Sequence, residues 1–344
     1  MRKEQSMKKK ITALLLAAAM TAAAFAGCGK AEDKAEKTKE TESKVEETEE
    51  APIDVNIMAL KGPTAMGLVE MMESSDYNFS IAASVDEVSP KLLQGETDIA
   101  AIPANLASVL YNKTEGDIQV LAINTLGVLY IVENGETIQS AADLKGKTIY
   151  ASGKGATPEY ALNYILSSNG INPETDVTIE WKSEHSECVA ALASQENAVA
   201  MLPQPFVTTA QTKNPEIRTA LDLTKEWDAL QEGEEKKSSM ITGVVVARKE
   251  FAEENPEEIQ EFLKEYHTSV DCVNENITDA AQLIEKYDIV PAAVAEKALP
   301  ACNIVCIDGE EMEEKLSGYL EVLKAQNPQA VGGEVPNHDF YYIQ

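Results

Sequence analysis

Two short turns carry lysine, glycine and threonine at matching positions, a combination suited to binding a small polar molecule or an anion. Residues 61–64 read Lys-Gly-Pro-Thr, and residues 154–157 read Lys-Gly-Ala-Thr. In both places an apolar segment precedes the turn and a helical pattern follows it. Such a turn directs free backbone N–H groups and the positive end of a helix dipole at one point. The threonines could cap their helices or donate to a ligand, and the lysines could neutralise an anion or remain solvated.

The segments around these turns repeat one plan along the chain. Residues 95–103 (Gly-Glu-Thr-Asp-Ile-Ala-Ala-Ile-Pro) correspond to residues 195–203 (Gln-Glu-Asn-Ala-Val-Ala-Met-Leu-Pro). Each copy predicts a turn followed by a parallel strand that is buried on both faces, and a proline that ends the strand. Further strands are predicted at 55–60, 77–82, 118–124, 147–151 and 177–181. Two βαβαβ units indicate an α/β fold of two lobes, each a mainly parallel sheet flanked by helices, although such units also recur in other α/β proteins.

The order of these units predicts the domain boundaries. Lobe 1 is expected to comprise residues 52–126 plus 249–344, and lobe 2 residues 134–240. The apolar runs 127–133 and 241–248 are predicted to be extended hinge crossings between the lobes, beginning near Gly127 and Gly243.

The first residues of the chain resemble a bacterial lipoprotein signal. Residues 1–27 have a basic start and a short apolar run that ends in Phe-Ala-Gly before Cys28,. The resemblance implies that Cys28 is lipidated, with palmitate among the expected acyl groups, and anchors the protein to the extracytoplasmic face of the cell membrane. Ordinary secretory cleavage with an incidental Cys28 is the alternative. Residues 28–51 are acidic and almost without large apolar side chains, and they predict a disordered tether.

Charge and cysteine content exclude some functions. The formal net charge of −29 and the lack of a basic stripe argue against nucleic-acid binding,. Besides Cys28, the chain has four cysteines, and an exported protein permits disulfides between them. Cys302 and Cys306 lack a nearby second ligand pair, so buried thiols are favoured over a metal site. The cysteines are Cys188, Cys272, Cys302 and Cys306.

Together these features resemble substrate-binding lipoproteins of ABC importers. The resemblance rests on the signal, the tether, the glycine turns, residues 144–149 (Leu-Lys-Gly-Lys-Thr-Ile) and residues 191–206, which contain Ala-Leu-Ala-Ser and Pro-Gln-Pro-Phe. The pattern is similar to that of the taurine, aliphatic-sulfonate, nitrate and thiamine-pyrimidine receptors, which have the type II periplasmic-binding-protein fold. The resemblance implies a monomeric, non-enzymatic protein without a cofactor that captures a small molecule between its lobes. It further implies delivery of that molecule to ABC permease and ATPase subunits.

The ligand should lie beyond the carboxyl ends of the parallel strands. The residues predicted there to bind it are Lys61, Gly62, Thr64, Ser84, Asn105, Ser152, Lys154, Gly155, Thr157, Trp181, Gln204 and Thr242. The arginines are Arg2, Arg218 and Arg248, and none falls in a predicted cleft loop. A guanidinium clamp is therefore not expected, which argues against an amino-acid or phosphate receptor. A sulfonate-type anion held by helix N-termini, or a nitrogen heterocycle stacked on Trp181, both remain open.

The sequence leaves two other functions open. His185 and Cys188 are close enough in sequence for a thiol–imidazole pair, but no orienting group accompanies them, and residues of a solvent-facing helix start are favoured. An enzyme of cofactor biosynthesis on the same fold is the main alternative, and a ligand sensor is another. For a binding protein, Trp181 is expected to report ligand by its fluorescence, and Trp227 to report little.

Overall fold

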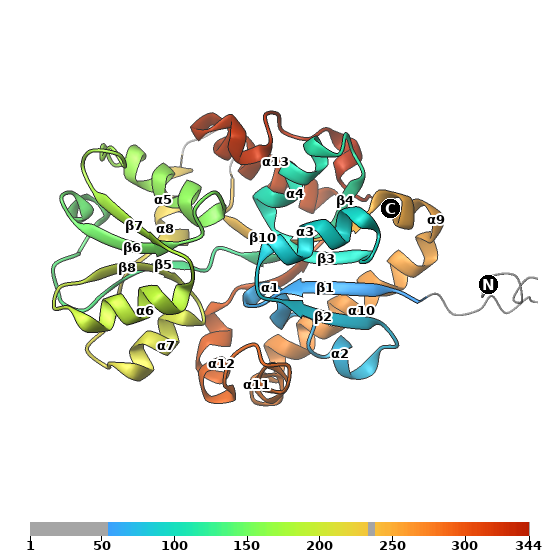
Figure 1. Cartoon of the computed structure of the whole chain (residues 1–344), viewed down its shortest axis with the longest axis horizontal. Helices are drawn as coiled ribbons and strands as arrows, with labels where there is room; N and C mark the ends of the chain where they lie inside the picture. The colour runs from blue at the N-terminus through green and yellow to red at the C-terminus, as the bar shows by residue number, and fades with distance from the viewer. Residues whose placement is uncertain (1–53, 233–237, 344) are drawn as a thin grey trace, which may run out of the picture. The chain divides into compact units, whose positions relative to one another are not determined.

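The computed structural model describes residues 54–232 and 238–343, which form two β-sheets with helices on both faces of each (Figure 1). The predicted signal peptide, the tether and Cys28 lie outside the described residues. The first sheet has the strand order β11-β4-β10-β3-β1-β2, and the second has β7-β6-β8-β5-β9. Sheet 1 and sheet 2 denote them below.

The strands have the following bounds. Sheet 1 contains β1 (Asn56–Leu60), β2 (Asn78–Ala82), β3 (Ile99–Pro103), β4 (Ile118–Leu126), β10 (Ile241–Arg248) and β11 (Ile304–Ile307). Sheet 2 contains β5 (Leu129–Glu133), β6 (Thr148–Ser152), β7 (Thr178–Lys182), β8 (Val199–Pro203) and β9 (Arg218–Asp222). In each sheet three neighbouring strands run parallel, and the remaining strands join antiparallel. The two-lobed α/β fold predicted from the repeated units is confirmed.

Helices cover both faces of each sheet. Four helices precede the first strand of sheet 2 in the sequence: α1 (Pro63–Met66), α2 (Met71–Ser74), α3 (Val85–Gln94) and α4 (Ala104–Lys113). Those attached to sheet 2 are α5 (Thr157–Ser168), α6 (His185–Ser194), α7 (Phe206–Lys213) and α8 (Leu223–Leu230). The last are α9 (Lys249–Glu254), α10 (Pro256–Glu275), α11 (Ile277–Lys286), α12 (Ala292–Ala298) and α13 (Gly309–Gln326). Four short 3₁₀ helices are described: η1 (Ala141–Leu144), η2 (Leu299–Ala301), η3 (Pro328–Val331) and η4 (His338–Phe340).

Successive side chains of a strand point to opposite faces of its sheet, and in the central strands the side chains on both faces are apolar. Helices therefore cover both faces of each sheet. In β1, Ile57 and Ala59 belong to one hydrophobic cluster and Met58 to another, so both faces are dry. In β8, Met201 and Leu202 likewise face different clusters. A strand buried on both faces reads as a continuous apolar run, which is why the sequence located these strands to within one or two residues.

The apolar runs predicted as hinge crossings are strands, each hydrogen-bonded within one sheet. Residues 129–133 form β5 between β8 and β9, and residues 241–248 form β10 between β3 and β4. Burial is the reason, because an extended run without a polar face is stable only where both faces are covered. The short link between β4 and β5 contains Gly127, where an added Cβ would lie 2.1 Å from the Thr224 hydroxyl oxygen.

The C-terminal elements return to sheet 1 and also contact sheet 2 helices. β11 pairs with β4, and Tyr341 bridges to Val120. On either side of the link between the sheets, α12 lies against α7, and α13 lies against α5 (Figure 1). Cys188, Cys272, Cys302 and Cys306 are free thiols. In the described part of the chain, no helix has the length and apolarity needed to cross a bilayer.

Candidate functional site

The carboxyl ends of the parallel strands in the two sheets meet, and one hydrogen bond joins them directly. Asn105 stands just after β3 in sheet 1, and Thr157 begins α5, which follows β6 in sheet 2. The backbone N–H of Thr157 donates to Oδ1 of Asn105 at 3.1 Å. Both residues are buried. The two edges at which ligands of parallel sheets bind therefore face each other.

The two Lys-Gly-x-Thr turns lie at these edges, one on each sheet. Gly62 has φ 132° and Gly155 has φ 78°, conformations that favour glycine,. Apart from the adjacent residues, no atom of the described residues lies within 4 Å of where either Cβ would be. Neither threonine caps its helix through its side chain. The Thr64 hydroxyl donates to the Leu60 carbonyl at 2.8 Å, and the Thr157 hydroxyl lies 3.4 Å from Asn105 Oδ1.

The lysines of these turns are not buried in the site. Lys61 forms an ion pair with Asp288 at 3.1 Å, and its side chain is 40% exposed. Lys154 is exposed at the tip of its turn. Of the predicted residues, Lys61, Lys154 and Gly155 therefore lie at the surface.

Both arginines among the described residues are held by carboxylates away from the facing edges. Arg248 pairs with Asp98 at 3.0 Å and with Glu250 at 3.2 Å. Arg218 pairs at 2.8 Å with Glu133, whose side chain is fully buried.

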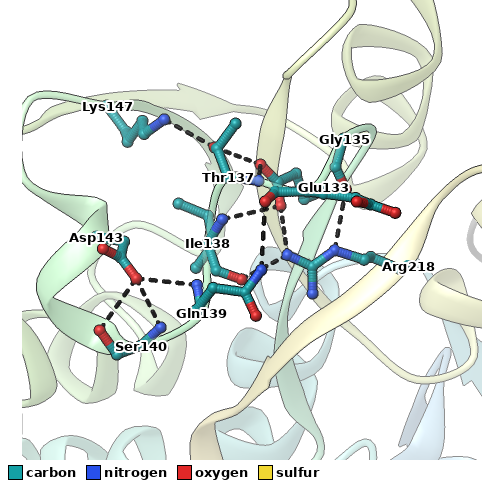
Figure 2. A network of polar contacts seen from close by, with 10 residues as sticks. Glu133, Gly135, Thr137, Ile138, Gln139, Ser140, Asp143, Lys147 and Arg218 are labelled. Atoms are coloured by element: carbon teal, nitrogen blue, oxygen red, sulfur yellow. Dashed lines mark hydrogen bonds and ion pairs between the residues drawn. The ribbon is translucent and has the colours of Figure 1, made fainter.

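Figure 2 shows how the Glu133 carboxylate is satisfied. It accepts hydrogen bonds from the Thr137 N–H at 2.8 Å, the Thr137 hydroxyl and the Ile138 N–H at 3.1 Å, beside the Arg218 guanidinium. Burial alone would raise the pKa of Glu133. The hydrogen bonds and the Arg218 charge together lower it by more than burial raises it, so the pKa of Glu133 falls below its usual value,. Glu133 ends β5 at the edge of sheet 2 opposite the one that faces sheet 1, so this network stabilises the lobe.

Uncharged donors lie at the facing edges instead. The Thr242 hydroxyl oxygen is buried and, among the described residues, has no hydrogen-bond partner. Gln204 stands two residues before α7, and its Oε1 accepts from the Thr208 hydroxyl at 2.9 Å and from the Thr208 N–H at 3.3 Å. No hydrogen bond of the Gln204 NH₂ group to the described residues is found, so this donor is available to a ligand.

A histidine that the sequence assigned to a solvent-facing helix start stands at the same edge. His185 begins α6, and its Nδ1 lies 2.5 Å from the hydroxyl oxygen of Ser152, the last residue of β6. Its ring packs on Phe206, the first residue of α7, with ring centres 4.8 Å apart. Burial lowers the pKa of His185 to about 4, so the imidazole is neutral near pH 7,. The signal that could have identified it is its position directly after a predicted strand.

Two predicted ligand residues lie apart from this group. Ser84 precedes α3 after β2, the outermost strand of sheet 1, and is half-buried without a side-chain capping bond. Trp181 is half-buried and packs against the hydrophobic cluster shared with the α5 residues Leu162 and Ile165. No group of three or more potential metal ligands is found in the described part of the chain.

Comparison with known proteins gives one family and many similar folds. The family described as ABC transporter, phosphonate, periplasmic substrate-binding protein matches residues 71–298. No curated protein sequence matches the chain.

Several solved structures share the fold. An ABC transporter protein from Parabacteroides distasonis has a TM-score of 0.70 and 23% identity, covering 84% of this chain and 98% of its own. The aliphatic sulphonate binding protein SsuA from Escherichia coli has a TM-score of 0.68 and 16% identity, covering 85% and 92%. The nitrate-binding protein NrtA from Synechocystis PCC 6803 has a TM-score of 0.55 and 15% identity, covering 70% and 68%. Because the family match spans more than half of the chain, this protein belongs to the family of periplasmic substrate-binding proteins of phosphonate ABC transporters.

Proposed function

We propose that this protein captures one small oxyanion, a phosphonate or sulfonate, between its two lobes and delivers it to the permease and ATPase of an ABC importer. The observation that carries the proposal is the Asn105–Thr157 hydrogen bond, which brings the carboxyl edge of sheet 1 against that of sheet 2. A ligand there would meet polar groups from both lobes and be desolvated by both.

The chemistry of the facing edges favours an oxyanion over a nitrogen heterocycle. The available groups are mainly donors, namely the Gln204 NH₂ group and the Thr242 hydroxyl. At the second glycine turn the Gly155 N–H already donates to Glu159 Oε2 at 2.6 Å, so an oxyanion would have to replace that carboxylate. Trp181, the residue expected to stack on a heterocycle, is half-buried against the hydrophobic cluster that contains Leu162 and Ile165. The family description names phosphonate, and SsuA is a sulphonate-binding protein. The oxyanion would be bound by uncharged donors, since Arg218 and Arg248 are engaged elsewhere,.

We assign the direct contacts to Gly62, Thr64, Ser152, Gly155, Gln204 and Thr242, with His185 added to the residues expected from the sequence. Lys61, Ser84, Lys154 and Trp181 are not included, because the two lysines lie at the surface and Ser84 follows the outermost strand of sheet 1, while Trp181 is packed against a hydrophobic cluster. The two alternatives, an enzyme of cofactor biosynthesis and a ligand sensor, have no specific observation in their favour.

Replacing Thr242 by valine should weaken binding about tenfold, because one hydrogen bond to a charged oxygen is lost at nearly constant volume. Calorimetric titration with methylphosphonate and with methanesulfonate measures the effect. Thr178→Val makes the same side-chain change and is the control. Thr178 is exposed at the first residue of β7, the end of that strand away from the facing edges. Unchanged affinity in Thr242→Val would remove this hydroxyl from the site.

Membrane anchoring is proposed on the sequence alone, through Cys28. Cys28→Ser should release the protein from the membrane fraction, because no acyl chain can then attach, and should leave affinity for the oxyanion unaltered. Fractionation with immunoblotting checks the first point and calorimetry the second. If the variant stays in the membrane fraction, the lipoprotein assignment fails.

A further inference from the structure

We propose that Asn105 is a latch that holds the two lobes closed without ligand and thereby sets how slowly a bound oxyanion leaves. The proposal concerns regulation of the site described above, so its ligand-dependent part rests on the proposed function. Its ligand-free part does not.

Both polar ends of the Asn105 side chain are used inside the protein. Oδ1 accepts the Thr157 N–H at 3.1 Å, and Nδ2 donates to the Ala330 carbonyl at 3.2 Å. Asn105 is 2% exposed and Thr157 is 1% exposed. The side chain therefore joins α4, the C-terminal η3 and α5 of the other sheet through a hydrogen bond shielded from water. It is a bridge between lobes more than a free ligand donor, which differs from the role expected from the sequence.

The Thr157 N–H needs an acceptor that its own helix does not provide. The first N–H groups of a helix have no intrahelical partner, and Ala156 at the N-cap has no side chain that could accept one,. The Asn105 amide oxygen fills this position from the opposite lobe. Separating the lobes would exchange this bond for hydrogen bonds to water, and an intramolecular hydrogen bond is worth about 0.5–1.5 kcal/mol net, so the bond favours the closed arrangement.

Apolar packing beside the bond is continuous across the two lobes. Trp227 of α8 is fully buried, and its ring centre lies 5.5 Å from that of Tyr319 in α13 and 4.5 Å from that of Tyr164 in α5. Tyr319 lies close to Thr157, and burial raises its pKa. Trp227 therefore stands where the lobes touch, so it should report lobe separation, contrary to the small response expected from the sequence.

The latch predicts a shift in the ligand-free equilibrium. Losing one dry inter-lobe hydrogen bond should raise the open fraction about tenfold. Because ligand is released from the open form, methylphosphonate should dissociate about tenfold faster. Loss of the bond acts by shifting the equilibrium between the closed and the open arrangement of the lobes. It requires no direct contact between Asn105 and the ligand.

The test uses the two tryptophans of the chain. With Trp181→Phe as background, acrylamide quenching of Trp227 without ligand should increase in Asn105→Ala. Asn112→Ala is the matched control, because Asn112 lies on the same helix and binds the same C-terminal segment, at Val331 and Glu334 with 2.7 Å each, without reaching the other lobe. A cooperative urea transition and a circular dichroism spectrum like those of the parent guard against a folding defect in the alanine variant.

Stopped-flow dissociation of methylphosphonate then tests the second half of the proposal. Faster release from Asn105→Ala, with Asn112→Ala at the parent rate, supports the latch. Equal quenching in Asn105→Ala and the parent overturns it, whatever ligand the protein binds. Increased quenching without any binding of phosphonate or sulfonate would uphold the latch and reject the proposed function.

Discussion

Replacement of Arg218 by methionine is expected to lower the free energy of unfolding by about 3 kcal/mol. The change leaves the fully buried Glu133 carboxylate without its cation, although the Thr137 and Ile138 donors remain. An uncompensated buried charge is the physical reason, since methionine keeps most of the packing of the arginine stem. Urea unfolding followed by circular dichroism at pH 7 measures the change.

An exposed ion pair supplies the control. Lys264→Met removes a pair with Glu261 whose side chains are 73% and 51% exposed, and should change stability by less than about 0.5 kcal/mol,. Equal stability of Arg218→Met and the wild type would contradict the account of Glu133.

The Glu133 network also has a predicted pH dependence. Its folded pKa is lowered, so its contribution to stability is present above the unfolded pKa of about 4.3 and is lost as the pH falls through the folded pKa,. In Arg218→Met this acid-dependent loss should become smaller, because the native state holds the carboxylate charge less strongly.

Gly243→Ala should weaken oxyanion binding by tenfold or more, on the order of the 1–3 kcal/mol that overpacking costs. The new Cβ would lie 2.4 Å from Asn124 Oδ1 and 2.5 Å from Thr64 Cγ2. Asn124 donates to the Thr64 carbonyl at 3.3 Å, so relieving the clash moves the Thr64 turn in lobe 1. Calorimetric titration with methylphosphonate measures the loss.

Gly146→Ala is the control for Gly243→Ala, because it introduces backbone strain at a glycine that lies away from the site. Gly146 has φ 77° and open space around its Cβ position, so alanine there should reduce stability by about 1 kcal/mol and leave affinity unchanged,. If Gly243→Ala binds with wild-type affinity, lobe 1 does not contribute the Thr64 turn to the site.

Local sequence pattern was enough for most of the fold. The runs at 99–103 and 199–203 are strands because they are apolar on both faces, and period and length alone identify them,. The same pattern misled at 129–133 and 241–248, because an apolar extended run does not reveal whether it crosses between sheets or lies inside one. Sheet order depends on pairing between distant segments, which no window of sequence contains.

The site was less predictable for the same reason. Lys61 looked available for an anion, yet it pairs with Asp288 in a loop far along the chain. Asn105 looked like a ligand donor, yet Ala330 and Thr157 occupy both ends of its amide. His185 looked like part of a solvent-facing helix start because the nearby sequence shows no group that would orient it, yet its Nδ1 lies 2.5 Å from the hydroxyl oxygen of Ser152, which ends a different strand. Position at a strand end could be read from the sequence, whereas the hydrogen-bond partners required the folded structure.

Calorimetric titration of the wild-type protein with methylphosphonate, methanesulfonate, nitrate and an aminopyrimidine tests the central claim most directly. The account predicts saturation of one site by the phosphonate or the sulfonate, at an affinity lowered in Thr242→Val and Gly243→Ala. Saturation by the aminopyrimidine alone, or no binding of either oxyanion, would contradict it.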